Sequence, residues 1–324
     1  MRHHLLKTIF ILTLIFFSTP LQAAEVLMVL WQGRTSAETG FEERMKQLQP
    51  DVSFKYIDAK RDKGKLASAL RDYDFSKTDL VYTFGTTGTK IVKSFLKGKK
   101  PQVFNMVSAP LRSKIVNSIE KPGHNLTGAK LLVDLDTQFE VLQKMRELKS
   151  VGIWFDPREK QNNAVIKNLT EIGKKRGFKI VPLRLIPDSP KIDKLLKNVS
   201  DDANKLDALY VVATSSFSVI YDKMFKQLDS KLLVMGGVHR HVGFGATVAL
   251  AASYKERGAA TADIAHQILS GKKAGDIPVN VVTPKTAFLY VDPNKAKAVG
   301  LNNIKSLGLN IVERDKPVTF KKKK

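Results

Sequence analysis

The chain contains 324 residues, no cysteine, 43% hydrophobic residues and a formal net charge of +23. The lack of cysteine excludes disulfides, thiolate metal sites and a cysteine nucleophile, while the length and apolar share suggest two domains with packed cores. A basic chain suggests nucleic acid, anionic membranes or anionic ligands as partners, but the scattering of the lysines favours a solvated basic face.

The N-terminal segment has the three-part order of a secretory signal peptide. Arg2 and Lys7 supply positive charge, residues 5–17 are almost wholly apolar, and small residues follow up to Ala24. The apolar run is shorter than the roughly 20 residues that span a bilayer, and an uncleaved membrane anchor is the alternative. We expect residues 1–24 to be a signal peptide, cleaved near Ala23 or Ala24, and the mature protein to lie in the periplasm. Export argues against nucleic acid as a partner.

The first half of the mature chain alternates apolar runs with helical patterns. Residues 25–31 are continuously apolar, which is typical of a strand buried on both faces. Phe41, Met45 and Leu48 are spaced as on one face of a helix. Further strands are predicted at 54–57, 79–84 and 102–105. The glycine-rich turn 85–88 connects one of them to a helix, and this alternation indicates a parallel sheet covered by helices.

The same alternation repeats after residue 150. A helix with Val165, Leu169 and Ile172 on one face ends at Gly177. The small apolar residues of 246–252 suit a strand that crosses between two lobes. The other predicted strands are 150–155, 178–183, 208–212, 231–235 and 288–291, with helices around 264–269 and at 293–299. Ligands bind at the carboxyl ends of strands in such sheets, so two facing lobes predict a cleft there.

Four segments carry a resemblance to a known family. Residues 122–128, Pro-Gly-His-Asn-Leu-Thr-Gly, resemble the PGxNxTG crossover of one ABC-transporter substrate-binding family, whose members include binders of aromatic amino acids. Residues 85–89 resemble the GTxAT turn of that family, and residues 271–279 are similar to its GxxPxDIPV stretch. Residues 234–258 resemble its returning segment, with Tyr254 and Gly258 near the end.

The resemblance implies a fold and a role. The implied fold is α/β, of the type I periplasmic-binding class, with two Rossmann-like lobes of parallel sheet joined by a hinge of three crossovers. The implied function is the solute-binding component of an ABC importer, working as a monomer with a small-molecule ligand, an inner-membrane permease and its ATPase, and with no cofactor. We expect lobe 1 to hold 25–127 and 248–274, lobe 2 to hold 128–247 and 275–312, and 313–324 to be a disordered basic tail.

The turn at Gly85, Thr86 and Thr87 is the first expected ligand contact. Backbone N–H groups at the start of a helix attract a carboxylate or phosphate, and the resemblance implies that this turn receives the ligand carboxylate. A plain helix N-cap is the alternative. In the loop that follows the first strand, Trp31 could stack on a flat ligand and Arg34 could pair with an anion, with Gln32 between them in the sequence. Their alternative is a solvated rim.

The remaining expected contacts follow other strands of the two sheets. The resemblance places Asn162 or its neighbour at the ligand, whereas capping of the nearby helix is the alternative. The set is completed by Asn105, Ser108, Arg158, Ser215 and Gly237.

The charge of the ligand is indicated by two loops. Amino-acid binders of the family tend to carry acidic residues where this chain has 108–110 and 213–217, which contain none. Because burying an unpaired ammonium is expensive, we expect a carboxylate-bearing ligand without an amine. The run His239-Arg240-His241 suggests a wall that binds anions, with a surface cluster as the alternative. His-x-His can also bind metal, but no third ligand is near, and we expect no metal site.

Other functional classes remain open at this point. The chain contains no H-E-x-x-H, G-x-S-x-G or G-x-G-x-x-G motif, so we do not expect an enzyme. A periplasmic sensor module that feeds a membrane sensor kinase would use the same cleft. A structural envelope protein held by its basic surface to anionic lipids is the third alternative.

Overall fold

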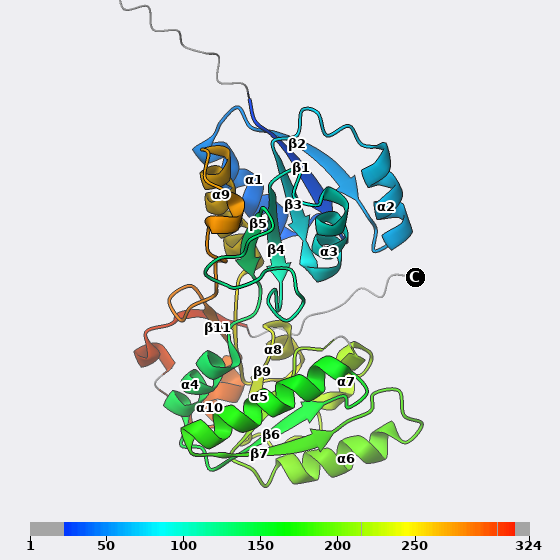
Figure 1. Ribbon diagram of the computed structural model, residues 1–324. Coiled ribbons are helices and arrows are strands. Elements are labelled where there is room, and N and C mark those ends of the chain that lie inside the picture. The colour runs from blue at the N-terminus through cyan, green and yellow to red at the C-terminus, as the bar shows by residue number, and fades with distance from the viewer. Residues whose placement is uncertain (1–22, 215, 303, 315–324) are drawn as a thin grey trace, which may run out of the picture.

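The computed structural model describes residues 23–214, 216–302 and 304–314. Within these residues the chain forms two α/β lobes, one above the other in Figure 1. The sheet of lobe 1 has the order β2-β1-β3-β4-β5 and is parallel throughout. Its elements are β1 (Glu25–Leu30), α1 (Ser36–Leu48), β2 (Ser53–Asp58), α2 (Lys63–Asp72), β3 (Leu80–Phe84), α3 (Gly85–Leu96), β4 (Gln102–Val107), β5 (Leu126–Lys130) and α9 (Tyr254–Leu269).

Helices cover both faces of the lobe 1 sheet. On β1, Val26 and Met28 pack toward α1 and α9, whereas Leu27 and Val29 pack toward α2 and α3. All four side chains are fully buried. Alternate residues of a strand point to opposite faces, and the continuous apolar run of β1 therefore fills two cores at once. The predicted parallel sheet covered by helices is confirmed.

Lobe 2 is built on a larger sheet with the order β12-β11-β10-β9-β8-β6-β7. The sheet is parallel except for β10 and β11, which pair antiparallel. Its elements are α4 (Leu135–Met145), β6 (Ser150–Phe155), α5 (Lys160–Arg176), β7 (Lys179–Arg184), α6 (Ile192–Ala203), β8 (Ala208–Val211), α7 (Tyr221–Met224), β9 (Leu233–Gly236), α8 (Arg240–Phe244), β10 (Val248–Ala251), β11 (Phe288–Val291), α10 (Pro293–Ala298) and β12 (Asn310–Glu313).

In its described part the chain crosses between the lobes three times. The crossings run from β5 to α4, from β10 to α9, and from Asn280 to β11. Arg257 on α9 is buried and donates from Nη2 to the side-chain oxygen of Asn280. The backbone of Asn280 in turn bonds both Gly128 and Lys130 at the end of β5. The three crossings are thus tied together on the lobe 1 side.

Four predicted boundaries differ from the structure. Lobe 1 extends past its expected limit of 274, because Ile277 and Val279 are buried with residues of its sheet. The strand predicted to cross at 246–252 is β10, which pairs with β9 and β11 inside the lobe 2 sheet, so lobe 1 resumes at α9 and not at 248. The lobe 1 sheet continues through Lys130, beyond the expected limit of 127. The expected tail also begins too early, because β12 pairs with β11 up to Glu313. Residues 1–22 and 315–324, which hold most of the expected signal peptide and tail, lie outside the described residues.

Helices α1 and α9 touch through their backbones, although they are distant in the sequence. Both contact residues are glycines: a Cβ at Gly40 would overlap the carbonyl oxygen of Lys255, and a Cβ at Gly258 would overlap that of Ala37. The same Cβ at Gly258 would lie 2.7 Å from the backbone nitrogen of Phe41. The close approach lets Phe41 and Ala262 share the core of lobe 1.

Candidate functional site

The carboxyl ends of the parallel strands face one another across the junction of the lobes. β5 leaves lobe 1 at this edge, and β10 leaves lobe 2 at the opposite edge. The loops after β1, β3 and β4 therefore lie on the lobe 1 side of the junction, and the loops after β6, β8 and β9 lie on the lobe 2 side. This is the arrangement in which open α/β sheets bind ligands.

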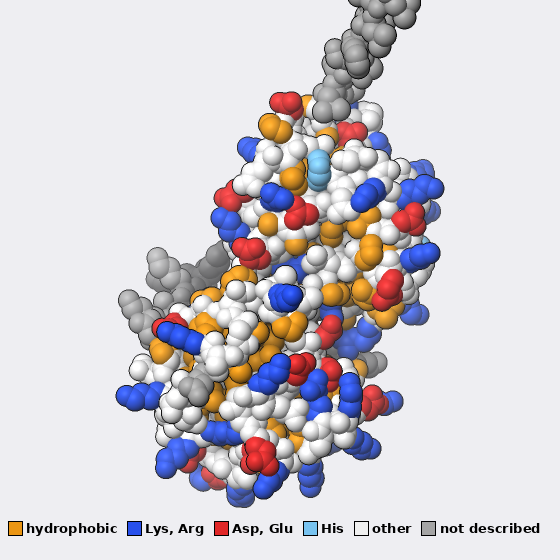
Figure 2. Space-filling view, turned by 90° about the vertical axis from the view of Figure 1, so that its left-hand side faces the viewer, with side chains coloured by type: hydrophobic (Ala, Val, Ile, Leu, Met, Phe, Trp, Pro, Cys, Tyr) orange, Lys and Arg blue, Asp and Glu red, His pale blue; other side chains and the backbone are white. Residues whose placement is uncertain are grey.

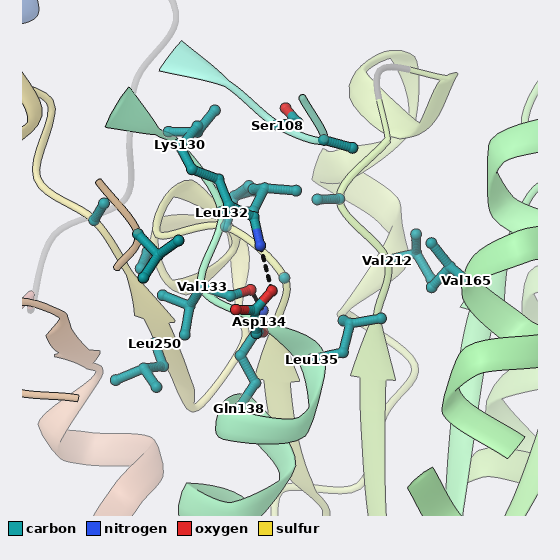
Figure 3. Close-up of a pocket in the computed structure, with 18 of the residues that line it drawn as sticks. Ser108, Lys130, Leu132, Val133, Asp134, Leu135, Gln138, Val165, Val212 and Leu250 are labelled. Atoms are coloured by element: carbon teal, nitrogen blue, oxygen red, sulfur yellow. Dashed lines mark hydrogen bonds and ion pairs between the residues drawn. The ribbon is translucent and has the colours of Figure 1, made fainter. Parts of the chain in front are cut away.

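A cavity of about 860 Å³ lies at this junction. Its volume is within the usual range for a site that binds a small organic molecule. Figure 3 shows Ser108 entering from the lobe 1 side, Val133 and Leu135 from the first crossing, and Val212 and Leu250 from the lobe 2 sheet. In Figure 2, apolar side chains gather on lobe 2 next to the junction. Both lobes and all three crossings contribute to the lining.

The base of the cavity is apolar because its polar groups bond one another. The hydroxyl of Tyr210 donates to Oε1 of Gln138 over 3.1 Å, and Nε2 of Gln138 donates to the carbonyl of Val133 over 3.0 Å. Tyr210 and Gln138 are both 2% exposed. Burial raises the pKa of the Tyr210 phenol, which therefore stays neutral. The surface that a ligand can contact at this base is therefore mainly hydrocarbon.

The cavity lining also includes the ionisable residues Lys130, Asp134, His239 and Arg240. Lys130 forms an ion pair with Asp134, drawn as a dashed line in Figure 3. The imidazole of His239 lies 5.1 Å from the ring of Tyr290 and 6.1 Å from that of Tyr254. Burial, followed by the positive charges of Arg314 and Arg240, lowers the pKa of His239 to about 4. His239 is therefore neutral at pH 7, and Arg240 carries the positive charge on this side.

Three of the expected contacts line the cavity: Ser108, Asn162 and Gly237. Asn162 is buried and donates from Nδ2 to the carbonyl of Asp156 over 3.1 Å, so its amide is bonded to the loop that precedes α5. Gly237 has no room for a side chain, since its Cβ would lie 2.9 Å from the hydroxyl of Tyr210. Its backbone forms the cavity wall instead.

The turn after β3 lies at the same junction but does not line the cavity. Gly85, Thr86 and Thr87 form the first turn of α3 and are half-buried. Gly85 has a φ of +72°, a left-handed conformation that glycine adopts without strain. Trp31 packs beside this turn, with its Cβ 3.7 Å from the place of a Cβ at Gly88.

Other expected contacts are bound to protein groups in this structure. Arg34 forms an ion pair with Glu42 at 2.7 Å and donates to the hydroxyl of Tyr56, and Gln32 accepts a bond from Arg61. Neither Arg34 nor Gln32 lines the cavity.

Two contacts expected at the ends of β4 and β6 are also bound to protein groups. Asn105 is fully buried and donates to the hydroxyl of Tyr82, inside the core of lobe 1. Arg158 forms ion pairs with Asp156 and Asp188. Neither side chain lines the cavity, and Ser215 lies outside the described residues.

The structure also brings together residues that the sequence analysis did not select. The first crossing, residues 130–135, forms one wall of the cavity, and Tyr254 and Leu250 form part of another. In addition, the carboxylate of Glu159 accepts a 2.6 Å bond from the hydroxyl of Thr214. An acidic group therefore reaches the 213–217 loop, whose own residues include no acid. The PGxNxTG resemblance, which ends just before the first crossing, was the one signal that pointed to this wall.

His239 and His241, on either side of Arg240, do not point to a common site. His241 is fully buried, with Nε2 3.1 Å from the hydroxyl of Tyr221, whereas His239 faces the cavity. Within the described residues, no three His, Asp or Glu side chains gather as a metal site would require. No helix in this part of the chain has the length and apolar character needed to cross a bilayer.

Comparisons with known proteins match this architecture. A tyrosine-binding protein of Clostridioides difficile (strain R20291) is 23% identical over 263 residues, which cover 79% of this chain and 74% of that protein. The ligand-free, open structure of a substrate binding protein with adhesive properties from Clostridium difficile superposes with a TM-score of 0.78 at 21% identity, covering 90% of this chain and 99% of that one. An ABC domain from Streptococcus pneumonia in complex with L-Trp superposes with a TM-score of 0.64 at 19% identity, covering 89% and 100%.

These solved structures share the fold of this chain, which is the type I periplasmic-binding fold expected from the sequence. The family model for ABC transporter substrate binding proteins matches residues 26–304. That match covers both lobes and all three crossings. The chain belongs to the ABC transporter substrate binding protein family.

Proposed function

We propose that this protein is the periplasmic solute-binding component of an ABC importer and hands a small ligand to an inner-membrane permease driven by its ATPase. The observation that carries the proposal is the 860 Å³ cavity, lined by both lobes and by the three crossings that join them. A ligand held there contacts both lobes at once. Its occupancy can therefore be sensed as a change in their relative orientation.

Binding by closure of the two lobes follows from this geometry. The turn at Gly85, Thr86 and Thr87 faces the junction from lobe 1 but lies outside the present cavity lining. A rotation about the three crossings would bring its backbone N–H groups toward a ligand held on lobe 2. Ligand then favours the closed form, because only that form contacts it from both sides.

We expect the radius of gyration of the mature protein to decrease when ligand saturates it. Native mass spectrometry of the purified protein would identify a retained small molecule, and X-ray scattering with and without that molecule would measure the change. A solute of similar size that gives no thermal stabilisation is the control. An unchanged radius at saturation would contradict closure, and no bound solute from any compound class would contradict the proposed function.

We further expect the mature chain to begin at Ala24 or Glu25 and to appear in the soluble periplasmic fraction. The carbonyl of Ala24 accepts a 2.9 Å bond from the backbone nitrogen of Ser53, and β1 starts at the next residue. Cleavage before Ala24 keeps this bond, and cleavage before either residue leaves the first strand whole. The intact mass of the fractionated protein tests the prediction, which a full-length chain in the membrane pellet would refute.

A further inference from the structure

Arg240 is a charged side chain at the cavity to which the described residues offer no acidic partner. It follows β9, begins α8, is half-buried and lines the cavity. Its guanidinium lies 5.5 Å from the centre of the Tyr221 ring. No ion pair joins it to a described carboxylate, in contrast to Arg34, Arg158 and Arg176 elsewhere in the chain. A half-buried cation that stacks on a ring in this way retains donors for a ligand.

The other charges around the cavity cancel one another or are exposed. Lys130 is neutralised by Asp134. Arg112 and Glu120, of opposite sign, are both exposed on the loop after β4. His239 is neutral at pH 7. The carboxylate of Glu159 is engaged by Thr214, and Glu159 does not line the cavity. Among the described residues that line the cavity, the charge left for a ligand is therefore the positive charge of Arg240.

The wall that continues from Arg240 is hydrocarbon. Val212 and Leu250 extend from the sheet of lobe 2, and Val133 joins them from the first crossing; all three are buried residues of the lobe 2 core. Leu135 and Val165 are half-buried and complete the surface shown in Figure 3. An apolar body can lie on this surface without leaving a polar group unsatisfied.

We propose that the solute is an amphipathic organic anion, with a hydrocarbon body on the lobe 2 wall and a carboxylate or similar head group bound by Arg240. The proposal deepens the proposed function and rests on it. A guanidinium binds a carboxylate through two parallel N–H···O bonds, which a neutral amide cannot reproduce. A ligand ammonium in the same place would instead be repelled by Arg240.

The test compares three probes that share one hydrocarbon body: 3-phenylpropanoate, its primary amide and phenylalanine. We expect calorimetry to show that the parent protein binds the carboxylate at least about ten-fold more tightly than the amide, as one charge-assisted bond supplies. Arg240→Gln should bring the carboxylate to the level of the amide. Arg240→Lys, which keeps the charge without the planar fork, should retain part of the preference. Arg71→Gln, which removes an exposed arginine on α2, is the matched control and should leave the ratio unchanged.

The proposal is overturned if phenylalanine or the amide binds as tightly as the carboxylate, including the case in which the carboxylate does not bind. It is also overturned if folded Arg240→Gln keeps the parent preference. These outcomes are separate from the proposed function. A neutral or zwitterionic solute that binds and compacts the protein would leave the solute-binding role standing while excluding the anion.

Discussion

Gly258→Ala should lower the free energy of unfolding by about 3 kcal/mol, the upper end of the typical range for overpacked sites. The added methyl group would overlap the carbonyl of Ala37 and approach the backbone nitrogen of Phe41 to 2.7 Å. Both neighbours are backbone atoms of α1, so no side chain can turn away to make room. The helices must separate, and the core shared by Phe41 and Ala262 loosens with them.

Denaturant unfolding of parent and variant measures this effect. Gly88→Ala is the matched control, because Gly88 is also a buried helical glycine but its Cβ would meet Trp31 at an ordinary contact distance of 3.7 Å. The control should change the free energy of unfolding by no more than about 1 kcal/mol, the difference in helix propensity between the two residues. Equal loss in both variants would contradict the close α1–α9 contact as the cause.

Acid should destabilise the protein well before its carboxylates titrate. Burial, followed by the positive charge of Arg240, lowers the pKa of His241 to about 3. Between the ordinary pKa near 6.5 and this value, the unfolded chain binds a proton that the folded chain does not, so stability falls as pH falls. The slope is about 1.4 kcal/mol per pH unit. Between pH 6.5 and pH 5, His241 alone should therefore remove about 2 kcal/mol.

His239 adds to the same loss, by a smaller amount because its ring is only partly buried and solvent screens it. Unfolding free energies measured from pH 4.5 to pH 7 test the slope. His241→Gln should flatten it by about 1.4 kcal/mol per pH unit. A parent slope that survives in His241→Gln would show that other groups cause the acid loss.

The lobes could be predicted from the sequence because their strands are continuous apolar runs that are buried on both faces. Residues 25–30 and 150–155 are examples, and each strand lies within a residue of its expected place. β10 was assigned to the wrong lobe because a short run of small apolar residues packs equally well in either sheet. β10 pairs with β11, whose residues lie about 40 positions further along the chain, and no local sequence pattern predicts this pairing.

For the candidate site, the sequence could predict which strand ends lie near the ligand but not which side chains contact it. The rule that ligands bind at carboxyl ends places Ser108 and Gly237 at the junction, where they line the cavity. The rule cannot tell which side chains are already engaged. Asn105 is bound by Tyr82 and Arg34 by Glu42, and in each pair the partner comes from another element of the fold. The crossing wall at 130–135 has neither helical nor strand periodicity and was missed for that reason.

The position of α9 in the chain also has a consequence for folding kinetics. Lobe 1 begins at β1, yet the helix that covers one face of its sheet ends at Leu269. Until that helix is synthesised, Phe41 and Met45 have no partner helix, and a nascent chain presents an open apolar face. Contacts between residues more than 200 positions apart slow folding, because loop closure precedes the stabilising contacts. We expect the two lobes to fold as one late cooperative unit, with partly folded chains dependent on chaperones until α9 docks.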